Sequence, residues 1–297
     1  MFLSGPRRLE SLSPNPSNPL TVSVVISTYQ RPDACERALG SVLEQTEAPL
    51  EVLIVDDGSS DDTEARMRAW EARDARVRYL RSPHNSGTPA TTRNLGIRHA
   101  SGELIAFLDD DDEWLPSKLA AQLAILASED ADIVATNAVR SDGRLYFPDA
   151  SPVWSPTSLD IIRTNPVIMS SALARREQLL STPGFPTDAW VRGCEDYAMW
   201  LELASMGARF IVLGESLVRY EDGAEDRLSR ERARIQAGVA RLAWRHALRA
   251  PRSRVGVYAA LKYSIGIGYV IAEDALASIA ARRRERLEQP IGGSAGS

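Results

Sequence analysis

Four consecutive aspartates, Asp109 to Asp112, directly follow the apolar run 103–108. Adjacent carboxylates repel one another, so such a run is stable where water solvates it, where it caps a helix, or where a cation neutralises it. A solvated turn is the ordinary explanation of an acidic run. Here the preceding residues predict a buried strand, which favours a cation, and ligands that are all oxygen favour Mg2+ or Mn2+.

Polar clusters also follow two earlier apolar runs. Residues 21–27 lead into Ser27 to Arg31, and residues 51–55 lead into Asp56 and Asp57. Because ligands bind at the carboxyl ends of parallel strands, we expect both clusters and the four aspartates to line one crevice.

Short apolar runs alternating with helical patterns predict the fold. Strands are predicted at 21–27, 51–55, 77–81 and 103–108, and helices at Pro32, at Asp61 or Asp62, at 89–99, at Pro116 and at 195–206. This alternation implies right-handed crossovers. We therefore predict an α/β fold with a Rossmann-like, mainly parallel sheet flanked by helices.

Composition and missing signatures exclude several classes of protein. The sequence has 44% hydrophobic and 25% charged residues and a net charge of −5, as ordinary globular proteins do. It has no P-loop, no GxGxxG after the first strand and no HExxH, which argues against a P-loop kinase, a hydride-transfer enzyme and a zinc hydrolase. Cys35 and Cys194 stand far apart and outside any CxxC, so neither a disulfide framework nor structural zinc is predicted.

Five short motifs together resemble the family 2 glycosyltransferases, which have the GT-A fold. They are VVISTYQR (24–31), IVDDGSSD (54–61), NSG (85–87), TRNLG (92–96) and FLDDDD (107–112). Each motif alone is weak, but their order and spacing are specific, and the resemblance covers about residues 21–220.

The resemblance implies roles in binding a nucleotide-sugar donor. Ser27 and Tyr29 meet the base, with Tyr29 stacking on it, and Asp57 accepts a hydrogen bond from a uracil- or thymine-type edge. Asp109 and Asp111 form the D-x-D pair on Mn2+ or Mg2+. The other implied donor-binding residues are Thr28, Arg31, Asp56 in support of its loop, Arg93 near the diphosphate or the acidic run, and Asp110 toward the ribose.

Glu195 and Asp196 begin the predicted helix 195–206 and resemble the family's Glu-Asp motif beneath the acceptor site. The resemblance implies inversion, with Asp196 as the general base and Glu195 in reserve. The alternative is that both residues only complement the helix dipole. We assign Trp190 and Tyr197 to an acceptor pocket; Trp154 and Trp200 are weaker candidates, because most such side chains pack a core.

The termini differ in composition from the middle of the chain. We predict a flexible leader at 1–20, a GT-A catalytic domain at 21–222, divided into nucleotide-binding (21–115) and acceptor (116–222) halves, and a basic helical extension at 223–297. Residues 227–254 hold nine arginines and one acid, and the only charge in 255–272 is Lys262. Two interpretations stay open: docking on an anionic membrane surface, or an annex that packs on the catalytic domain or forms a homodimer.

Together these features predict a metal-dependent inverting glycosyltransferase of glycoconjugate or surface-polysaccharide synthesis. We expect a nucleoside-diphosphate sugar as donor, a saccharide or lipid-linked acceptor, no nucleic-acid partner, and a cytoplasmic location that includes the inner membrane face. One alternative is a non-catalytic nucleotide-sugar-binding or membrane-docking protein of the same fold. A sugar-phosphate nucleotidyltransferase is disfavoured, because STYQR (27–31) stands where its glycine-rich loop would be.

Overall fold

The structure is a computed structural model that describes residues 20–221, 235, 237–242 and 244 of the 297-residue chain. The predicted leader and most of the basic extension, including 255–272, lie outside the described residues. The chain divides into two compact units. The first comprises the residues up to Ser155, Val167–Gly184 and Ala208–Glu221, and the second comprises Pro156–Pro166, Phe185–Gly207 and the described residues from 235 onward. The predicted domain boundaries stay predictions.

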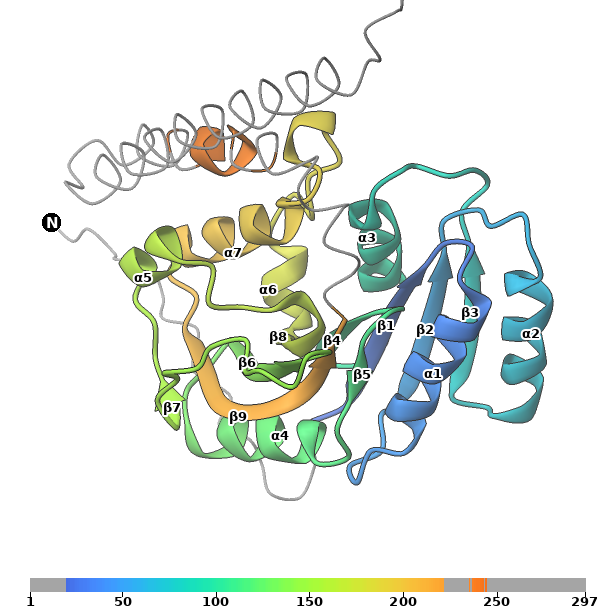
Figure 1. The fold of residues 1–297 in the computed structure, drawn as a ribbon, viewed down its shortest axis with the longest axis horizontal. Coiled ribbons are helices and arrows are strands. Elements are labelled where there is room, and N and C mark those ends of the chain that lie inside the picture. Colours follow the sequence, from blue (N-terminus) through green and yellow to red (C-terminus); the bar gives the residue numbers. More distant parts are fainter. Residues whose placement is uncertain (1–19, 222–234, 236, 243, 245–297) are drawn as a thin grey trace, which may run out of the picture. The chain divides into compact units, whose positions relative to one another are not determined.

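A single sheet runs through the first unit (Figure 1). Its strands are β1 (Val22–Thr28), β2 (Glu51–Asp56), β3 (Val77–Arg81), β4 (Leu104–Asp109), β5 (Glu113–Trp114), β6 (Ile133–Arg140), β7 (Val153–Trp154), β8 (Leu173–Arg175) and β9 (Phe210–Tyr220). Among the described residues the order is β3-β2-β1-β4-β8-β6-β9-β5, with β7 also paired to β9. The long ladders are parallel, and β5, β7 and β8 pair antiparallel. The predicted α/β fold with a mainly parallel sheet is confirmed.

Helices connect these strands. The first unit contains α1 (Pro32–Leu43), α2 (Thr63–Arg73), α3 (Pro89–His99), α4 (Lys118–Ser128), α6 (Arg176–Leu180) and the 3-10 turn η1 (Met169–Ser171); the second contains α5 (Ser158–Arg163), η2 (Ala189–Val191) and α7 (Glu195–Ser205). None of the described helices is both long and apolar enough to cross a bilayer.

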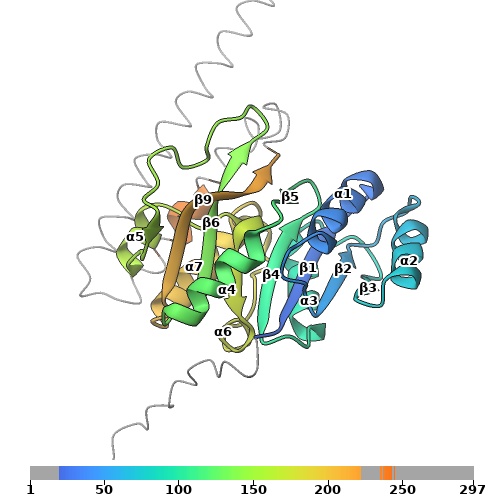
Figure 2. The ribbon, with the colours of Figure 1, turned by 90° about the horizontal axis from the view of Figure 1, so that it is seen from below.

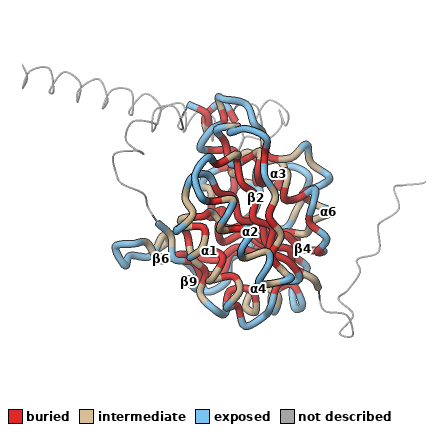
Figure 3. The backbone as a smooth tube through the Cα atoms, turned by 90° about the vertical axis from the view of Figure 1, so that its right-hand side faces the viewer, coloured by how far each residue is buried: buried red, intermediate tan, exposed pale blue. Residues whose placement is uncertain are grey.

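The strands of the first unit are buried on both faces, which explains their nearly continuous apolar sequences. One core cluster joins Ile26 of β1 to Leu39 of α1 and Leu119 of α4. On the other face α3 packs closely, since a Cβ added at Gly96 would lie 2.5 Å from a methyl group of Val25. Figure 2 shows α1 and α3 on opposite sides of β1 and β2, and Figure 3 shows buried residues along β2 and β4.

The helices predicted to begin at Pro32, at residue 89 and at residue 195 begin there in the structure. Two other helix starts differ in detail. The helix predicted to be capped by Asp61 or Asp62 has Asp62 at its N-cap without a side-chain cap bond. Asp61 Oδ1 instead accepts from the Thr63 amide at 3.0 Å. The helix predicted at Pro116 begins at Lys118.

Candidate active site

The three polar clusters meet at one edge of the sheet. Parallel pairing places Thr28 beside Asp56 and Ser27 beside Asp109. Asp57 continues the pairing, because its amide donates to the Thr28 carbonyl at 2.9 Å. Strands β1, β2 and β4 therefore end together, and their carboxyl ends position one candidate donor crevice.

Asp56, which the resemblance assigns to the support of its loop, accepts hydrogen bonds on both carboxylate oxygens. Its side chain is fully buried, and Oδ1 accepts from the amide of Ser59 at 2.9 Å and from its hydroxyl at 2.6 Å. Oδ2 accepts from the Tyr79 hydroxyl at 2.5 Å, and Arg81 Nε lies 3.8 Å from the same oxygen. With both oxygens accepting hydrogen bonds, Asp56 stabilises the turn after β2.

Only one of the two carboxylate oxygens of Asp57 accepts hydrogen bonds in the described structure. Its Oδ2 accepts from the Ser86 amide and hydroxyl, both at 3.0 Å, and from the Gly87 amide at 3.2 Å. Its Oδ1 is buried and has no hydrogen-bond partner among the described residues. Buried polar atoms in folded proteins are almost always paired, so this oxygen is one that a donor from a bound molecule could satisfy.

Tyr29 lies at the end of β1, where the backbone turns sharply. The next residue, Gln30, has a φ of 53°, the only positive value at a non-glycine residue in the described chain. Its amide donates to the Ser59 hydroxyl at 2.8 Å, which ties this turn to the turn after β2. The Tyr29 side chain is 37% exposed, so its ring is open to a stacking partner.

Two arginines form ion pairs with carboxylates of the acidic run and so reduce the repulsion between them. Arg93, buried on α3, places Nη2 2.7 Å from Asp109 Oδ1. Arg31 places Nη1 3.1 Å from Asp110 Oδ1 and 2.6 Å from Asp111 Oδ2. Two cations of the chain itself thus offset part of the negative charge of the run, at Asp109, Asp110 and Asp111.

Burial alternates along the run. Asp110 and Asp112 are buried, whereas the side chains of Asp109 and Asp111 are 31% and 36% exposed. Burial raises the pKa of Asp110 to about 6, against the opposing effects of the Thr28 hydroxyl and Arg31. Burial, together with the charge of Asp109, raises the pKa of Asp112 to about 8. Asp109 and Asp111, the two more exposed aspartates, are the pair that the D-x-D pattern predicts to bind metal.

The donor set fits a hard divalent ion that is shared with a substrate. The described residues contain no group of three acidic, histidine or cysteine side chains arranged to hold a metal. Magnesium is commonly held by one or two carboxylates together with substrate phosphates. Asp109 and Asp111 can supply such carboxylates.

Ser170, a residue that the sequence pattern did not single out, supports this loop. The Asp109 amide donates to the Ser170 hydroxyl at 3.1 Å, and Trp114 Nε1 donates to the Ser170 carbonyl at 2.7 Å. At the end of β1, the Thr92 hydroxyl donates to the Ser27 hydroxyl at 2.9 Å. Ser170 lies about sixty residues from its partners, so no local signal could have identified it.

The second unit holds the predicted base at the start of α7. Glu195 is 5% exposed, and its Oε2 accepts from the amide of Gly193 at 2.7 Å. Gly193 has a φ of 84°, a value that favours glycine. Asp196 is half-buried, and its Oδ2 accepts from Asn165 Nδ2 at 3.4 Å. The two acids thus have different surroundings.

The aromatic acceptor candidates also differ. Tyr197 is 3% exposed and donates its hydroxyl to the Ile162 carbonyl at 2.9 Å, so its ring packs within the unit. Trp200 is completely buried. Trp190 is half-buried, and the Arg241 guanidinium lies 4.4 Å from its ring centroid. Of these three, only Trp190 retains surface that a sugar could contact.

This chain belongs to the family described as glycosyl transferase family 2, whose profile matches residues 23–175. It is 30% identical over 208 residues to the teichuronic acid biosynthesis glycosyltransferase TuaG of Bacillus subtilis, covering 67% of this chain and 78% of TuaG. It is 38% identical over 105 residues to the UDP-Glc:alpha-D-GlcNAc-diphosphoundecaprenol beta-1,3-glucosyltransferase WfgD of Escherichia coli, covering 35% of this chain and 40% of WfgD.

Other relatives are longer. The chain is 33% identical over 191 residues to a glycosyltransferase of Rickettsia conorii, and the match covers 63% of this chain but only 31% of the relative. The fold resembles that of the mannosyltransferase PcManGT from Pyrobaculum calidifontis, solved in complex with GDP-Man and Mn2+. That match has a TM-score of 0.60 at 21% identity and covers 94% of this chain and 84% of PcManGT. The GT-A fold expected from the motifs is confirmed.

Proposed function

We propose that this chain is a metal-dependent, inverting glycosyltransferase whose donor is a UDP- or dTDP-linked sugar. One observation carries the donor: Asp57 Oδ1 is buried and has no partner in the described structure, although Oδ2 has three. Uracil and thymine both present an N3–H that can donate to such an oxygen. An unpaired buried acceptor costs on the order of 1–3 kcal/mol, so a base that satisfies it is favoured. The exposed ring of Tyr29 provides a stacking surface nearby in the same crevice.

The diphosphate and its metal belong, in this proposal, beside the acidic run. Asp109 and Asp111 would hold Mn2+ or Mg2+ together with diphosphate oxygens, and the bound ion would neutralise the charge of the departing nucleoside diphosphate. Arg31 and Arg93 offset part of the charge of the carboxylates in the absence of donor. Their guanidinium groups have the geometry to contact phosphate oxygens as well.

Asp196 is the proposed general base. Its carboxylate removes the proton from the acceptor hydroxyl while the hydroxyl oxygen forms a bond to the anomeric carbon of the donor sugar. The bond between that carbon and the diphosphate oxygen breaks, and attack opposite the leaving group inverts the configuration. Support comes from the different surroundings of the two acids, because Glu195 is tied to the backbone of Gly193 and Asp196 contacts a side-chain amide.

We infer that the acceptor is a saccharide, free or lipid-linked. The relative WfgD is named for an acceptor on diphosphoundecaprenol. The nine arginines of 227–254 would favour an anionic membrane surface, where each basic residue contributes about 1 kcal/mol. Flotation of the full chain with liposomes of anionic and of neutral lipid tests this, and we expect salt-sensitive binding to the anionic liposomes only. Equal behaviour with both kinds of liposome would remove the membrane from the proposal.

A thermal-shift panel tests the donor. UDP, dTDP, GDP and CDP are each added with and without Mn2+, and UDP or dTDP with Mn2+ should raise the melting temperature most, because a ligand that binds only the folded state stabilises it. GDP giving the largest shift would overturn the proposed base. No shift with any nucleotide would count against donor binding altogether. Donor hydrolysis or transfer is then screened with sugars on the preferred nucleotide.

A further inference from the structure

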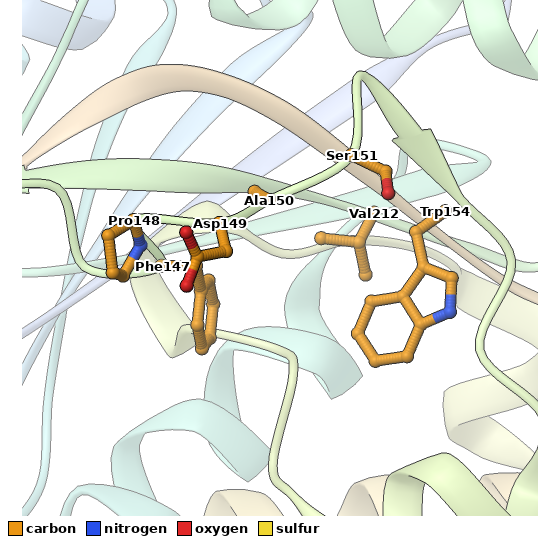
Figure 4. A pocket seen from close by; sticks show the side chains of 7 residues that line it. All are labelled: Phe147, Pro148, Asp149, Ala150, Ser151, Trp154 and Val212. Atoms are coloured by element: carbon orange, nitrogen blue, oxygen red, sulfur yellow. The ribbon is translucent and has the colours of Figure 1, made fainter.

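A second pocket lies in the first unit, away from the donor crevice. It has a volume of about 430 Å3 and is formed by the segment between β6 and β7 together with Val212 near the start of β9 (Figure 4). Strand β9 runs parallel to β6, and both run in the same direction as β4, to which they connect through the antiparallel β8. The start of β9 therefore lies at the amino ends of these parallel strands, whereas Asp109 lies at the carboxyl end of β4.

One end of the pocket segment is fixed by a buried amide. Asn137 is completely buried, and its Oδ1 accepts from the Phe147 amide at 3.0 Å while its Nδ2 donates to the Phe147 carbonyl at 2.9 Å. The Asn137 side chain thus pairs with Phe147 as a backbone would. The same residue lies at a register shift between β6 and β9. A buried amide with this arrangement holds the loop in one conformation.

The other end of the pocket segment, at Ser151 and Pro152, lies close against the backbone of Gly214. The Gly214 amide donates to the Pro152 carbonyl at 3.0 Å, and a Cβ at Gly214 would lie 2.3 Å from the Ser151 carbonyl oxygen. Two residues later, Trp154 of β7 pairs with Val212 of β9. With both ends fixed, the walls are formed before any ligand arrives, which lowers the entropy cost of binding.

The lining combines aromatic rings with hydrogen-bonding groups. Trp154 is 36% exposed, and its ring and the ring of Phe147 stand at the pocket with the Asp149 carboxylate and the Ser151 hydroxyl (Figure 4). No hydrogen bond or ion pair occupies the Asp149 carboxylate in the described structure. A pyranose has apolar C–H faces that pack on aromatic rings and hydroxyl groups that donate to carboxylates.

Other classes of ligand fit less well. The lining has no lysine, arginine or histidine, so a phosphate or nucleotide would meet only the negative charge of Asp149. An apolar peptide would cover Asp149 without pairing it, at the cost of desolvating a charge. We propose that this pocket binds a neutral pyranose unit of a saccharide, at a site separate from the donor crevice. The proposal uses the family of the chain but does not depend on the identity of the donor.

Saturation-transfer difference NMR tests the proposal on the full chain without nucleotide. The probes are methyl glycosides of glucose, galactose, mannose and N-acetylglucosamine, together with maltose and cellobiose. We expect saturation of ring protons for at least one probe with the natural protein, and an at least fivefold loss in Trp154→Ala. Val153→Ala is the matched control, because Val153 is the other residue of β7, is 52% exposed and is outside the lining. Absence of saturation for every probe, or equal signals from Trp154→Ala and Val153→Ala, would overturn the proposal.

Two further variants separate this pocket from the donor crevice and from misfolding. Asp149→Ala changes an exposed side chain and should weaken saturation without lowering the melting temperature. Asp57→Ala should leave saturation unchanged. If saturation disappears in Asp57→Ala and persists in both pocket variants, the sugar binds in the donor crevice, so the pocket proposal falls while the proposed glycosyltransferase stands.

Discussion

The turn after β2 and the first turn of α7 each carry two adjacent acidic residues, and the pairs behave alike. Asp56 and Glu195 are buried and accept hydrogen bonds from the backbone of their own turns. Asp57 retains a buried oxygen without a described partner, and Asp196 is half-buried beside the Asn165 amide. In both regions the first acid stabilises its turn, and we propose that the second acts in binding or catalysis.

The comparison shows how neighbouring carboxylates acquire different roles. Successive residues at the end of a strand point to opposite faces, and successive residues in a helical turn are about 100° apart. The two side chains of each pair therefore point in different directions and meet different partners, although Asp57 is buried as well as Asp56. If this division of roles is correct, replacing the first acid should reduce stability, and replacing the second should reduce catalysis or binding.

The largest effect is expected at Asp196. Replacement by Asn removes the proposed base and keeps the size of the side chain, so we expect the transfer rate to fall about a hundred- to ten-thousand-fold with nucleotide affinity unchanged. Initial rates and nucleotide titrations measure the two quantities separately. Glu195→Gln is the matched control and should keep transfer within a few-fold. The opposite pattern, with Glu195→Gln inactive and Asp196→Asn active, would assign the base to Glu195.

Asp57→Asn should change base preference as well as affinity. The amide oxygen can keep the bonds from Ser86 and Gly87, which leaves an NH2 donor where Oδ1 stood. That donor repels the N3–H of uracil but matches the N3 acceptor of cytosine. We expect UDP affinity to fall about ten- to a hundredfold and CDP affinity to rise relative to UDP, measured by calorimetry with Mn2+. Loss of UDP affinity with no relative gain for CDP would mean that Asp57 does not face the pairing edge of the base.

A smaller effect is expected at Asp56, and on stability. Asp56→Asn removes charge-assisted acceptors from the Ser59 and Tyr79 hydroxyls, so we expect a loss of about 1–3 kcal/mol in the free energy of unfolding. Urea unfolding gives the value. Asp62→Asn, on a side chain that is 63% exposed, should change stability by less than about 0.5 kcal/mol. Equal stability of the two variants would contradict the supporting role of Asp56.

The sequence predicted the parts of the fold that depend on local patterns. Strands β1 to β4 and helices α1 to α3 follow from apolar runs and helix-start signals within ten residues or so of one another. Strands β5, β7, β8 and β9 were not predicted. They are short or interrupted by residues such as Gly214 and Glu215, and they form because distant segments pair with them.

The same distinction applies to the sites. The carboxylates and arginines of the donor crevice belong to contiguous motifs, so a resemblance was sufficient to propose them. Ser170, which supports the acidic run, and Asn137, which fixes the pocket segment, act through partners that folding alone brings close. Trp154 was noticed only as one of several aromatic residues. Its exposure and its pairing with Val212 became apparent from the structure.

A last effect on stability, one that depends on pH, is expected at a buried lysine that has no carboxylate partner in the described structure. Lys118 is completely buried, its Nζ donates to Gln122 Oε1 at 2.9 Å and lies 3.8 Å from the Trp114 ring centroid, and the described structure contains no ion pair for it. Burial lowers the pKa of Lys118 well below its usual range. Since the unfolded chain then binds the proton more tightly, the free energy of unfolding should rise with pH between the folded and unfolded pKa values, by at most about 1.4 kcal/mol per pH unit.

The chain has only two lysines, Lys118 and Lys262, so lysine-selective 13C NMR can follow both titrations, and Lys118→Met identifies the signal. We expect the Lys118 signal to titrate at lower pH than Lys262. In urea unfolding, the stability of the natural protein relative to Lys118→Met should increase from pH 7 to pH 9, because the variant lacks the linked proton. Two signals that titrate together near the usual value of about 10.4, with parallel stability curves, would mean that Lys118 keeps its charge without a carboxylate partner. That result would show that the hydrogen bond to Gln122 and the contact with the Trp114 ring stabilise the buried ammonium group without a carboxylate.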